Sequence, residues 1–383
     1  MWFRWNRLIV MLTAAILVAV AVCVPFHTSA RETLAGELME IAQESLNAQY
    51  ATLVSGDIAT GLAGKRFETR FRNAIGDQLT SRVAIRSALL KKKIEFTAFR
   101  TKLVFQGLEV KDDKAQLTAI EITERDMNTP PGGPKITKSS DPHIFDFVKT
   151  SGEWQLVSDT IVRPKPVFSQ DGEDLPLVPL PPPTTDGPPE KNLRRRHHAV
   201  LTPRSVAAMP VGYDRITAIN YARAHALSYN TDFKRFGNDC TNFISQTLLA
   251  GGWQMVYGLY THNDVWWYTC SLPGGYACHA SYTWGAAYNF HAFLNTGPGH
   301  RTDYVQYYGD VWPGDLIFAD WDRPGQHLPD GRIDHVMFVT GRDTEGNLFI
   351  SQHTTDRLDR PFAEVILSET SAQFFGHRVK DSY

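Results

Sequence analysis

The sequence predicts an α+β protein, because two helical patterns are each followed by strands of antiparallel character. Apolar residues repeat at helical spacing over 34–54, and near residue 94 the pattern changes to the alternation of a β-meander that ends at residue 162. The same order returns after residue 212, with helices expected over 213–227 and from Cys240. Strands then follow at 314–319, 336–340 and 348–351, and 365–367 is expected to add an edge strand. Helices that precede antiparallel strands are typical of the α+β class.

At 383 residues the chain exceeds what one hydrophobic core usually organises, so we expect two domains. The first and smaller domain covers 31–162. A proline-dense segment marks a linker over 163–210, and the second domain covers 211–383. Residues 1–30 are set apart by their composition and are treated below as a leader.

The first domain should place its helices before its strands. After the helix over 34–54, a second helix is expected from about residue 57. Strands are expected at 94–103, 108–110, 114–125, 143–150 and 153–162. The closing hairpin around Ser151-Gly152 resembles the end of a cystatin-like or nuclear-transport-factor-like fold. No group of catalytic side chains stands out in this domain, and a targeting, an inhibitory or a dimerising role all stay open.

Residues 1–30 have the pattern of a signal peptide. Arg4 and Arg7 precede an apolar run over 8–24, and Thr28-Ser29-Ala30 places small residues where a signal peptidase reads them. We therefore expect a protein that is secreted or associated with the cell envelope. The apolar run could also span a bilayer if it is not cleaved, and membrane contact is expected only in that case. The net charge of −2 gives no reason to expect nucleic acid as a partner.

Three cysteines are left once the leader is removed: Cys240, Cys270 and Cys278. Export permits disulfides. Because Cys270 and Cys278 bracket a short glycine-containing turn, we expect them to pair and to leave Cys240 free. Zinc bound by these two cysteines and His279 is the alternative, but the sequence offers no second pair of ligands at the usual spacing. We expect no metal and no cofactor.

Cys240 has the position of a nucleophile at the start of a helix. Apolar residues follow it at i+3, i+4 and i+8, namely Phe243, Ile244 and Leu248. Asp239 is expected to cap this helix, which leaves Cys240 in the first turn, where free N–H groups and the positive end of the dipole favour a thiolate. The same N–H groups, with the Asn238 side chain as an extra donor, could hold a tetrahedral oxyanion.

His335 has the position of a general base. It opens the β-rich run over 336–340, and an imidazole at a strand end can reach a helix tip. A third polar group would orient the ring and set its tautomer. His353, which directly follows the next strand, is the first choice for this third member. Asp356 is the second choice.

Several blocks of sequence, in this order, resemble the bacterial putative amidase domain, a relative of the CHAP and NlpC-type papain-like hydrolases. They are N-D-C-T-N-F-I-S-Q at 238–246, Trp266-Trp267, Tyr282-Thr283-Trp284, Gly314-Asp315-Leu316-Ile317-Phe318, Ile333-Asp334-His335-Val336 and Ser351-Gln352-His353-Thr354. The resemblance covers about 212–362. It implies a papain-like fold, in which the helix bearing the cysteine packs on an antiparallel sheet. It also implies hydrolysis of an amide bond, with Cys240 as nucleophile and His335 as base.

An aromatic-rich stretch over 253–290 lies between these blocks. Most of its rings are expected to fill the core between the helices and the sheet. One or two could instead line a substrate groove, and Trp284 is the choice for that position. An isolated cysteine or a strand-edge histidine is more often structural than catalytic, so the site is inferred from Cys240 and His335 together.

The leading hypothesis is a secreted, cysteine-dependent amidohydrolase that works through a thiol acyl-enzyme. Its expected substrate is a peptide or another amide, with peptides of the bacterial cell wall as the candidate. Transfer of the acyl group to an amine in place of water is a variant of the same chemistry. The alternative from another class is a non-catalytic binding or scaffolding module at the envelope that kept the fold.

Overall fold

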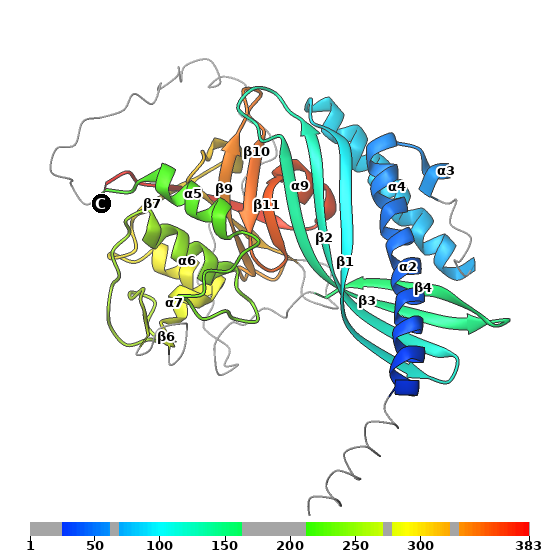
Figure 1. Cartoon of the computed structure of the whole chain (residues 1–383). Helices are drawn as coiled ribbons and strands as arrows, with labels where there is room; N and C mark the ends of the chain where they lie inside the picture. The colour runs from blue at the N-terminus through cyan, green and yellow to red at the C-terminus, as the bar shows by residue number, and fades with distance from the viewer. Residues whose placement is uncertain (1–24, 62–68, 163–211, 271–277, 322–328, 383) are drawn as a thin grey trace, which may run out of the picture.

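The computed structural model describes residues 25–61, 69–162, 212–270, 278–321 and 329–382 (Figure 1). The expected linker over 163–210 and most of the expected leader lie outside these residues, so both stay predictions. Within the described ranges, no helix combines the length and the apolar character needed to cross a membrane.

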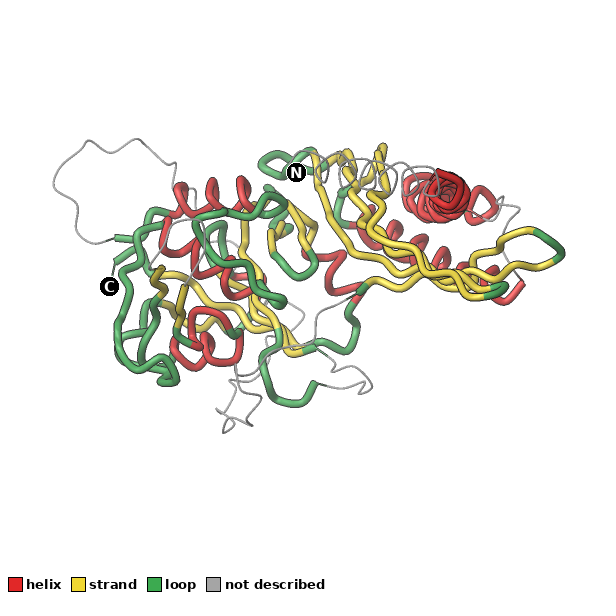
Figure 2. The backbone as a smooth tube through the Cα atoms, turned by 60° about the horizontal axis from the view of Figure 1, so that its bottom comes forward, coloured by secondary structure: helices red, strands yellow, loops and turns green. Residues whose placement is uncertain are grey.

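The N-terminal part has the expected order of helices before strands. Its helices are α2 (Pro25–Ser55), α3 (Ile58–Gly61) and α4 (Thr69–Lys91). Its strands are β1 (Glu95–Lys111), β2 (Lys114–Asn128), β3 (Ile136–Thr150) and β4 (Glu153–Ile161). The strands form the expected antiparallel meander, and α2 lies against one of its faces (Figures 1 and 2). Leu38, Ile41 and Leu46 form the apolar stripe of α2 and pack on the meander in a buried core.

One long strand, β1, replaces the two strands expected at 94–103 and 108–110. The pairing of β1 with β2 changes register between Phe105 and Gly107. A Cβ atom at Gly107 would lie 2.9 Å from the Thr118 hydroxyl, so the glycine permits this close approach. The irregularity breaks the alternation of the sequence without ending the strand.

The C-terminal part begins with the two expected helices, α5 (Arg215–His225) and α6 (Cys240–Ala250). The elements that follow are β5 (Tyr268–Cys270), β6 (Cys278–Ala280), α7 (Tyr282–Gly285), α8 (Ala287–Leu294), β7 (Thr302–Val305), the short 3-10 helix η1 (Tyr308–Asp310), β8 (Leu316–Asp320), β9 (His335–Arg342), β10 (Leu348–Gln352), β11 (Asp356–Pro361), α9 (Phe362–Ser368) and β12 (Gln373–Val379). The apolar face of α6 packs on β8 and β9 in a core that contains Phe243, Ile244, Phe318, Val336 and Phe338. The α+β class is therefore confirmed, with the cysteine helix packed on antiparallel strands.

The expected edge strand at 365–367 is wrong, because this segment belongs to helix α9. Phe362 and Val365, one helical turn apart, bury their side chains in the core beside β9 and β10. A run as short as Val365-Ile366-Leu367 does not distinguish a strand from a buried helix by its periodicity. The edge position that the segment was expected to take is held by β7, which pairs with β12.

A single ten-stranded sheet runs through both parts of the chain, in the order β1-β2-β3-β11-β10-β9-β8-β12-β7, with β4 paired to β3. The two parts join where β3 pairs antiparallel with β11, through Ser140 opposite Asp356 and Ser139 opposite Arg357. A shared core also crosses this junction, since Phe349 of β10 packs with Tyr50, Leu53, Ile94 and Phe96 of the N-terminal part.

Candidate active site

Packing fixes the start of helix α6 over the sheet. Phe243, Ile244 and Leu248 are fully buried, so the helix cannot turn about its axis without losing this contact. The first hydrogen bond of the helix joins the Phe243 amide to the Asp239 carbonyl at 2.9 Å. Cys240 is therefore the first helical residue, as the sequence predicts, and it is buried and not in a disulfide.

The structure brings Cys240 to the start of strand β9. The backbone N–H of Val336 faces the Cys240 sulfur and favours its thiolate. Val336 directly follows His335, the first residue of β9. The His335 ring is buried and contacts the Trp321 ring at a centroid distance of 4.8 Å. The nucleophile and the base predicted from the sequence thus lie at neighbouring positions of one helix end and one strand end.

Burial dominates the acidity of the thiol. It raises the pKa of Cys240 from 9.0 to about 11, and the negative charge of Asp239 acts in the same direction. The Thr241 hydroxyl and the N–H groups of Thr241 and Val336 oppose this rise without cancelling it. Burial therefore favours the neutral thiol over the thiolate. A base then has to remove the proton before the sulfur can attack.

Asn238 lies next to the sulfur, as its predicted role requires. Its side-chain oxygen accepts a hydrogen bond from the Cys240 thiol over 3.4 Å. The Thr241 hydroxyl lies 3.6 Å from the same sulfur. The amide group of Asn238 is therefore in place beside the atom that would attack, and its role as an oxyanion donor stays a prediction.

Asp239 occupies the N-cap position of α6, but its side chain makes no cap hydrogen bond, contrary to the sequence-based expectation. Its carboxylate accepts hydrogen bonds from the Phe236 amide at 2.7 Å, from the Asn242 side chain at 2.9 Å and from the His353 ring at 2.7 Å. The buried carboxylate thus ties the loop before Cys240 to the end of β10. Because the side-chain cap hydrogen bond is absent, the Asp239 carboxylate does not accept hydrogen bonds from the backbone N–H groups of the first turn.

His353 contacts Asp239 and does not orient His335. Its Nδ1 lies 2.7 Å from the Asp239 carboxylate, and its Nε2 lies 2.8 Å from the His225 carbonyl oxygen. Both ring nitrogens face acceptors, so neither is left for a hydrogen bond to the base. The expected third-member role is thereby corrected: His353 holds the residue that precedes the nucleophile. The ring is packed between Tyr229 and Phe243, which fixes its plane.

Asp356, the second choice for the third member, is half-buried at the start of β11. Its carboxylate accepts hydrogen bonds from the Tyr229 hydroxyl at 2.9 Å and from the Thr354 amide at 3.3 Å. Burial raises the pKa of this carboxyl group. These contacts place Asp356 in the loop that supports Asp239, and an orienting role toward His335 stays a prediction.

Trp284 does not line a groove, contrary to expectation, because its side chain is fully buried. Its ring packs against Trp266 and Tyr268, and its N–H donates to the Asn242 side-chain oxygen over 2.8 Å. The bond reveals a residue that sequence reasoning missed. Asn242 is a polar residue on the buried part of α6, and its place in the N-D-C-T-N block is the signal that could have identified it.

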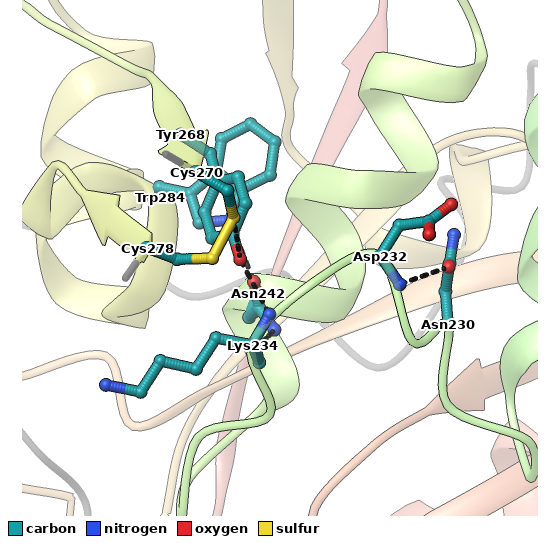
Figure 3. The surroundings of a disulfide bond; sticks show 8 residues. All are labelled: Asn230, Asp232, Lys234, Asn242, Tyr268, Cys270, Cys278 and Trp284. Atoms are coloured by element: carbon teal, nitrogen blue, oxygen red, sulfur yellow. Dashed lines mark hydrogen bonds between the residues drawn. A yellow bond between two sulfur atoms is a disulfide. The ribbon is translucent and has the colours of Figure 1, made fainter. Parts of the chain in front are cut away.

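The expected disulfide between Cys270 and Cys278 is present, with an S–S distance of 1.93 Å. It joins facing residues of the β5–β6 hairpin. Figure 3 shows how the disulfide lies beside the Tyr268 hydroxyl, which accepts a hydrogen bond from the Lys234 amide over 2.6 Å. The Lys234 carbonyl in turn accepts one from the Asn242 side chain at 3.0 Å. The hairpin therefore supports the loop that leads into Cys240.

Together these features define an α+β domain with a free cysteine at a helix start and a histidine at the start of the adjoining strand. Residues 212–376 match the family described as "Putative amidase domain". The match covers the whole segment from the start of the C-terminal part into β12.

Two proteins of Bacillus subtilis (strain 168) are similar to this chain. The uncharacterized protein YhbB is 32% identical over 145 residues, which are 38% of this chain and 42% of YhbB. The uncharacterized protein YjcM is 28% identical over 166 residues, which are 43% of this chain and 36% of YjcM. The chain therefore spans less than half the length of each relative.

Two solved structures are also similar, at low identity. The intermembrane space region of the chloroplast protein ARC6 is 9% identical, with 33% of this chain and 95% of that chain covered and a TM-score of 0.25. The Kfla4162 protein from Kribbella flavida is 16% identical, with 34% and 90% covered and a TM-score of 0.24. These scores are too low to carry an argument about the fold.

Proposed function

We propose that the C-terminal part is a cysteine-dependent amidohydrolase with Cys240 as its nucleophile. The observation that supports this proposal most is the free, buried thiol at the first turn of α6, directly beside the start of the strand that His335 opens. The packing of a buried cysteine would not by itself require a histidine at the start of the adjoining strand. The family match over 212–376 points to the bond that is cleaved.

In the proposed mechanism the imidazole of His335 takes the proton of the Cys240 thiol while the sulfur attacks the carbonyl carbon of the amide. The imidazolium then gives this proton to the leaving amine, and an acyl group remains on the sulfur. His335 next removes a proton from a water molecule, which attacks the thioester and releases the acid. The neutral resting thiol makes the first proton transfer a necessary step.

The negative charge that develops on the carbonyl oxygen needs donors near the sulfur. The Asn238 amide, which lies beside the thiol, and the N–H groups at the start of α6 are the groups we propose for this role. Because the Asp239 carboxylate is directed to the loop and to His353, it does not compete for these amides.

We propose peptides of the bacterial cell wall as the substrate class. Support comes from the expected export leader, since an exported bacterial hydrolase meets wall peptides, and from the amide chemistry of the family. The alternative is a binding or scaffolding module without turnover. Retention of both Cys240 and His335 at adjoining positions favours the enzyme.

Labelling with a thiol-directed electrophile separates the two functions. An enzyme should react at Cys240 when its base is present and lose this reaction in the His335→Ala variant, because the thiol is then left without a proton acceptor. The mature protein should also release new free amines from purified wall peptides, and Cys240→Ser should not. A Cys240 that reacts no faster than a thiol in a short peptide, together with an absence of new amines, would favour the scaffold.

A further inference from the structure

The loop His353-Thr354-Thr355-Asp356 holds the residue before the nucleophile at two points. The Asp239 amide donates to the Thr354 hydroxyl over 2.8 Å, and the Asp239 carboxylate lies 2.7 Å from the His353 ring. Both Asp239 and His353 are buried. The backbone and the side chain of Asp239 are therefore fixed by the same short loop, and a shift of that loop would move Cys240 with it.

The N-terminal part binds this loop at its far end. Ser140 of β3 pairs with Asp356, the residue at which the loop becomes strand β11, and the next pair joins Ser139 to Arg357. The Thr137 hydroxyl adds a hydrogen bond to the Leu358 carbonyl at 2.8 Å. Within the described residues, β11 lies between two strands. One is β3 of the N-terminal part, and the other is β10 of the C-terminal part.

Buried ion pairs hold the two parts together. Arg357 of β11 pairs with Asp141 of β3 at 2.9 Å, and Arg125 of β2 pairs with Glu364 of α9 at 2.9 Å. In each pair both side chains are at most 10% exposed. Removing one member of such a pair leaves a charge buried without compensation, so these contacts resist separation.

Apolar side chains also pack across the junction between the two parts. Phe349 is fully buried among residues of α2, α4 and β1, as in the core of one domain. The junction thus combines paired strands of one sheet with a shared apolar core. The N-terminal part therefore belongs to the same packed unit as the strands that carry the site.

We propose that the N-terminal part is a positioning element of the amidase site, which acts by pairing β3 with β11 and so fixing the loop that holds Asp239 beside Cys240. This inference rests on the proposed function. It assigns a role to residues 31–162, for which the sequence alone leaves several roles open. His353, Thr354 and Asp141 are positioning residues in this account, because they act on the nucleophile through Asp239 and not on the substrate.

The test uses the full chain with the variants Asp141→Asn and Thr354→Val, alone and combined. Asp141→Asn weakens the ion pair between Asp141 of β3 and Arg357 of β11. Thr354→Val removes the hydroxyl that accepts the hydrogen bond of the Asp239 amide. Each should lower kcat about tenfold at little change in KM, because small misplacements of reacting groups are costly. If both act through the same loop, the double variant should also lose only about tenfold, whereas independent effects would multiply.

The matched control is Lys93→Ala. Lys93 crosses the same junction to Glu345 at 2.8 Å, but this ion pair is exposed and is not part of the loop. Its removal should leave kcat unchanged. Should Asp141→Asn fail to fold, Thr137→Val removes a single hydrogen bond of the same strand pair and should give a smaller loss of kcat with the same lack of additivity.

A second measurement separates positioning from loss of stability and does not need a substrate. Alkylation of Cys240 followed against pH should show its midpoint at lower pH in Asp141→Asn, because a loosened loop admits water to the thiol, while the Lys93→Ala profile stays as in the wild type. An unchanged profile and kcat in Asp141→Asn, or losses that multiply in the double variant, would overturn the positioning role. A wild type without turnover would contradict the proposed function alone, and the alkylation profiles would still decide this inference.

Discussion

The neutral state of the buried thiol predicts how the stability of the protein changes at alkaline pH. Burial raises the pKa of Cys240 from 9.0 to about 11. The thiol of the unfolded chain keeps its ordinary acidity. Between these two pKa values the native state holds a proton that the unfolded state has lost, so the folded protein becomes less stable as the pH rises.

The size of this effect follows from the pKa change. A difference from 9.0 to about 11 corresponds to about 3 kcal/mol, since each tenfold change in acidity is about 1.4 kcal/mol. This contribution is fully present below the unfolded pKa of 9.0 and is lost as the pH rises through the folded pKa of about 11. Burial also raises the pKa of other groups, among them Tyr213, well above the ordinary value, so the contribution of the thiol has to be isolated by a difference.

The matched variant is Cys240→Ala, which removes the titrating group and leaves the other residues in place. Its free energy of unfolding should differ from that of the wild type by a constant amount from pH 7 to 9. From pH 9 to 11 the wild type should lose about 2 kcal/mol relative to the variant. Denaturant unfolding of both proteins at a series of pH values measures this difference. A difference that stays constant, or that moves in favour of the wild type as the pH rises, would refute a neutral resting thiol.

Three further results are expected. His335→Ala should remove nearly all turnover together with the bell-shaped pH dependence of the rate, which kcat/KM across pH would show; a surviving bell would assign the base to another residue. His353→Ala should lower the rate without abolishing it and should reduce the free energy of unfolding by about 1–3 kcal/mol, because it leaves the buried Asp239 carboxylate without one partner. Asp356→Ala should have smaller effects on both quantities. The reverse order in kinetic and unfolding assays would exchange the roles of the two residues. Replacing Cys270 and Cys278 by Ser should cost about 2 kcal/mol in denaturant unfolding, and an unchanged midpoint would show that the closed loop adds nothing.

The parts of the site that follow from local sequence could be predicted. The apolar stripe headed by Cys240 places the cysteine at a helix start, because helical periodicity depends on residues three and four apart. His335 was expected at a strand end, since Val336 begins a β-rich run, and it is the first residue of β9. The disulfide could be predicted because its two cysteines bracket one short turn.

Contacts between distant residues could not be predicted in the same way. His353 follows a strand as a third member would, yet its partner Asp239 lies 114 residues away and takes the ring nitrogen that the base would need. Trp284 has the amphipathic character of a groove residue, but the buried Asn242 satisfies its N–H inside the core. No periodicity indicates that β3 and β11 pair, because strand pairing depends on which edges meet after folding.

The central claim, that Cys240 is a nucleophile, is tested most directly by the mass of the intact protein during turnover of a wall peptide. Acid quenching within the first turnovers should trap a population whose mass is raised by the acyl part of the substrate, and peptide mapping should place this addition on Cys240. The Cys240→Ser variant, treated in the same way, should show neither the thioester nor released amine. Release of amine by Cys240→Ser at the rate of the wild type, with no addition on the cysteine of the wild type, would contradict the account.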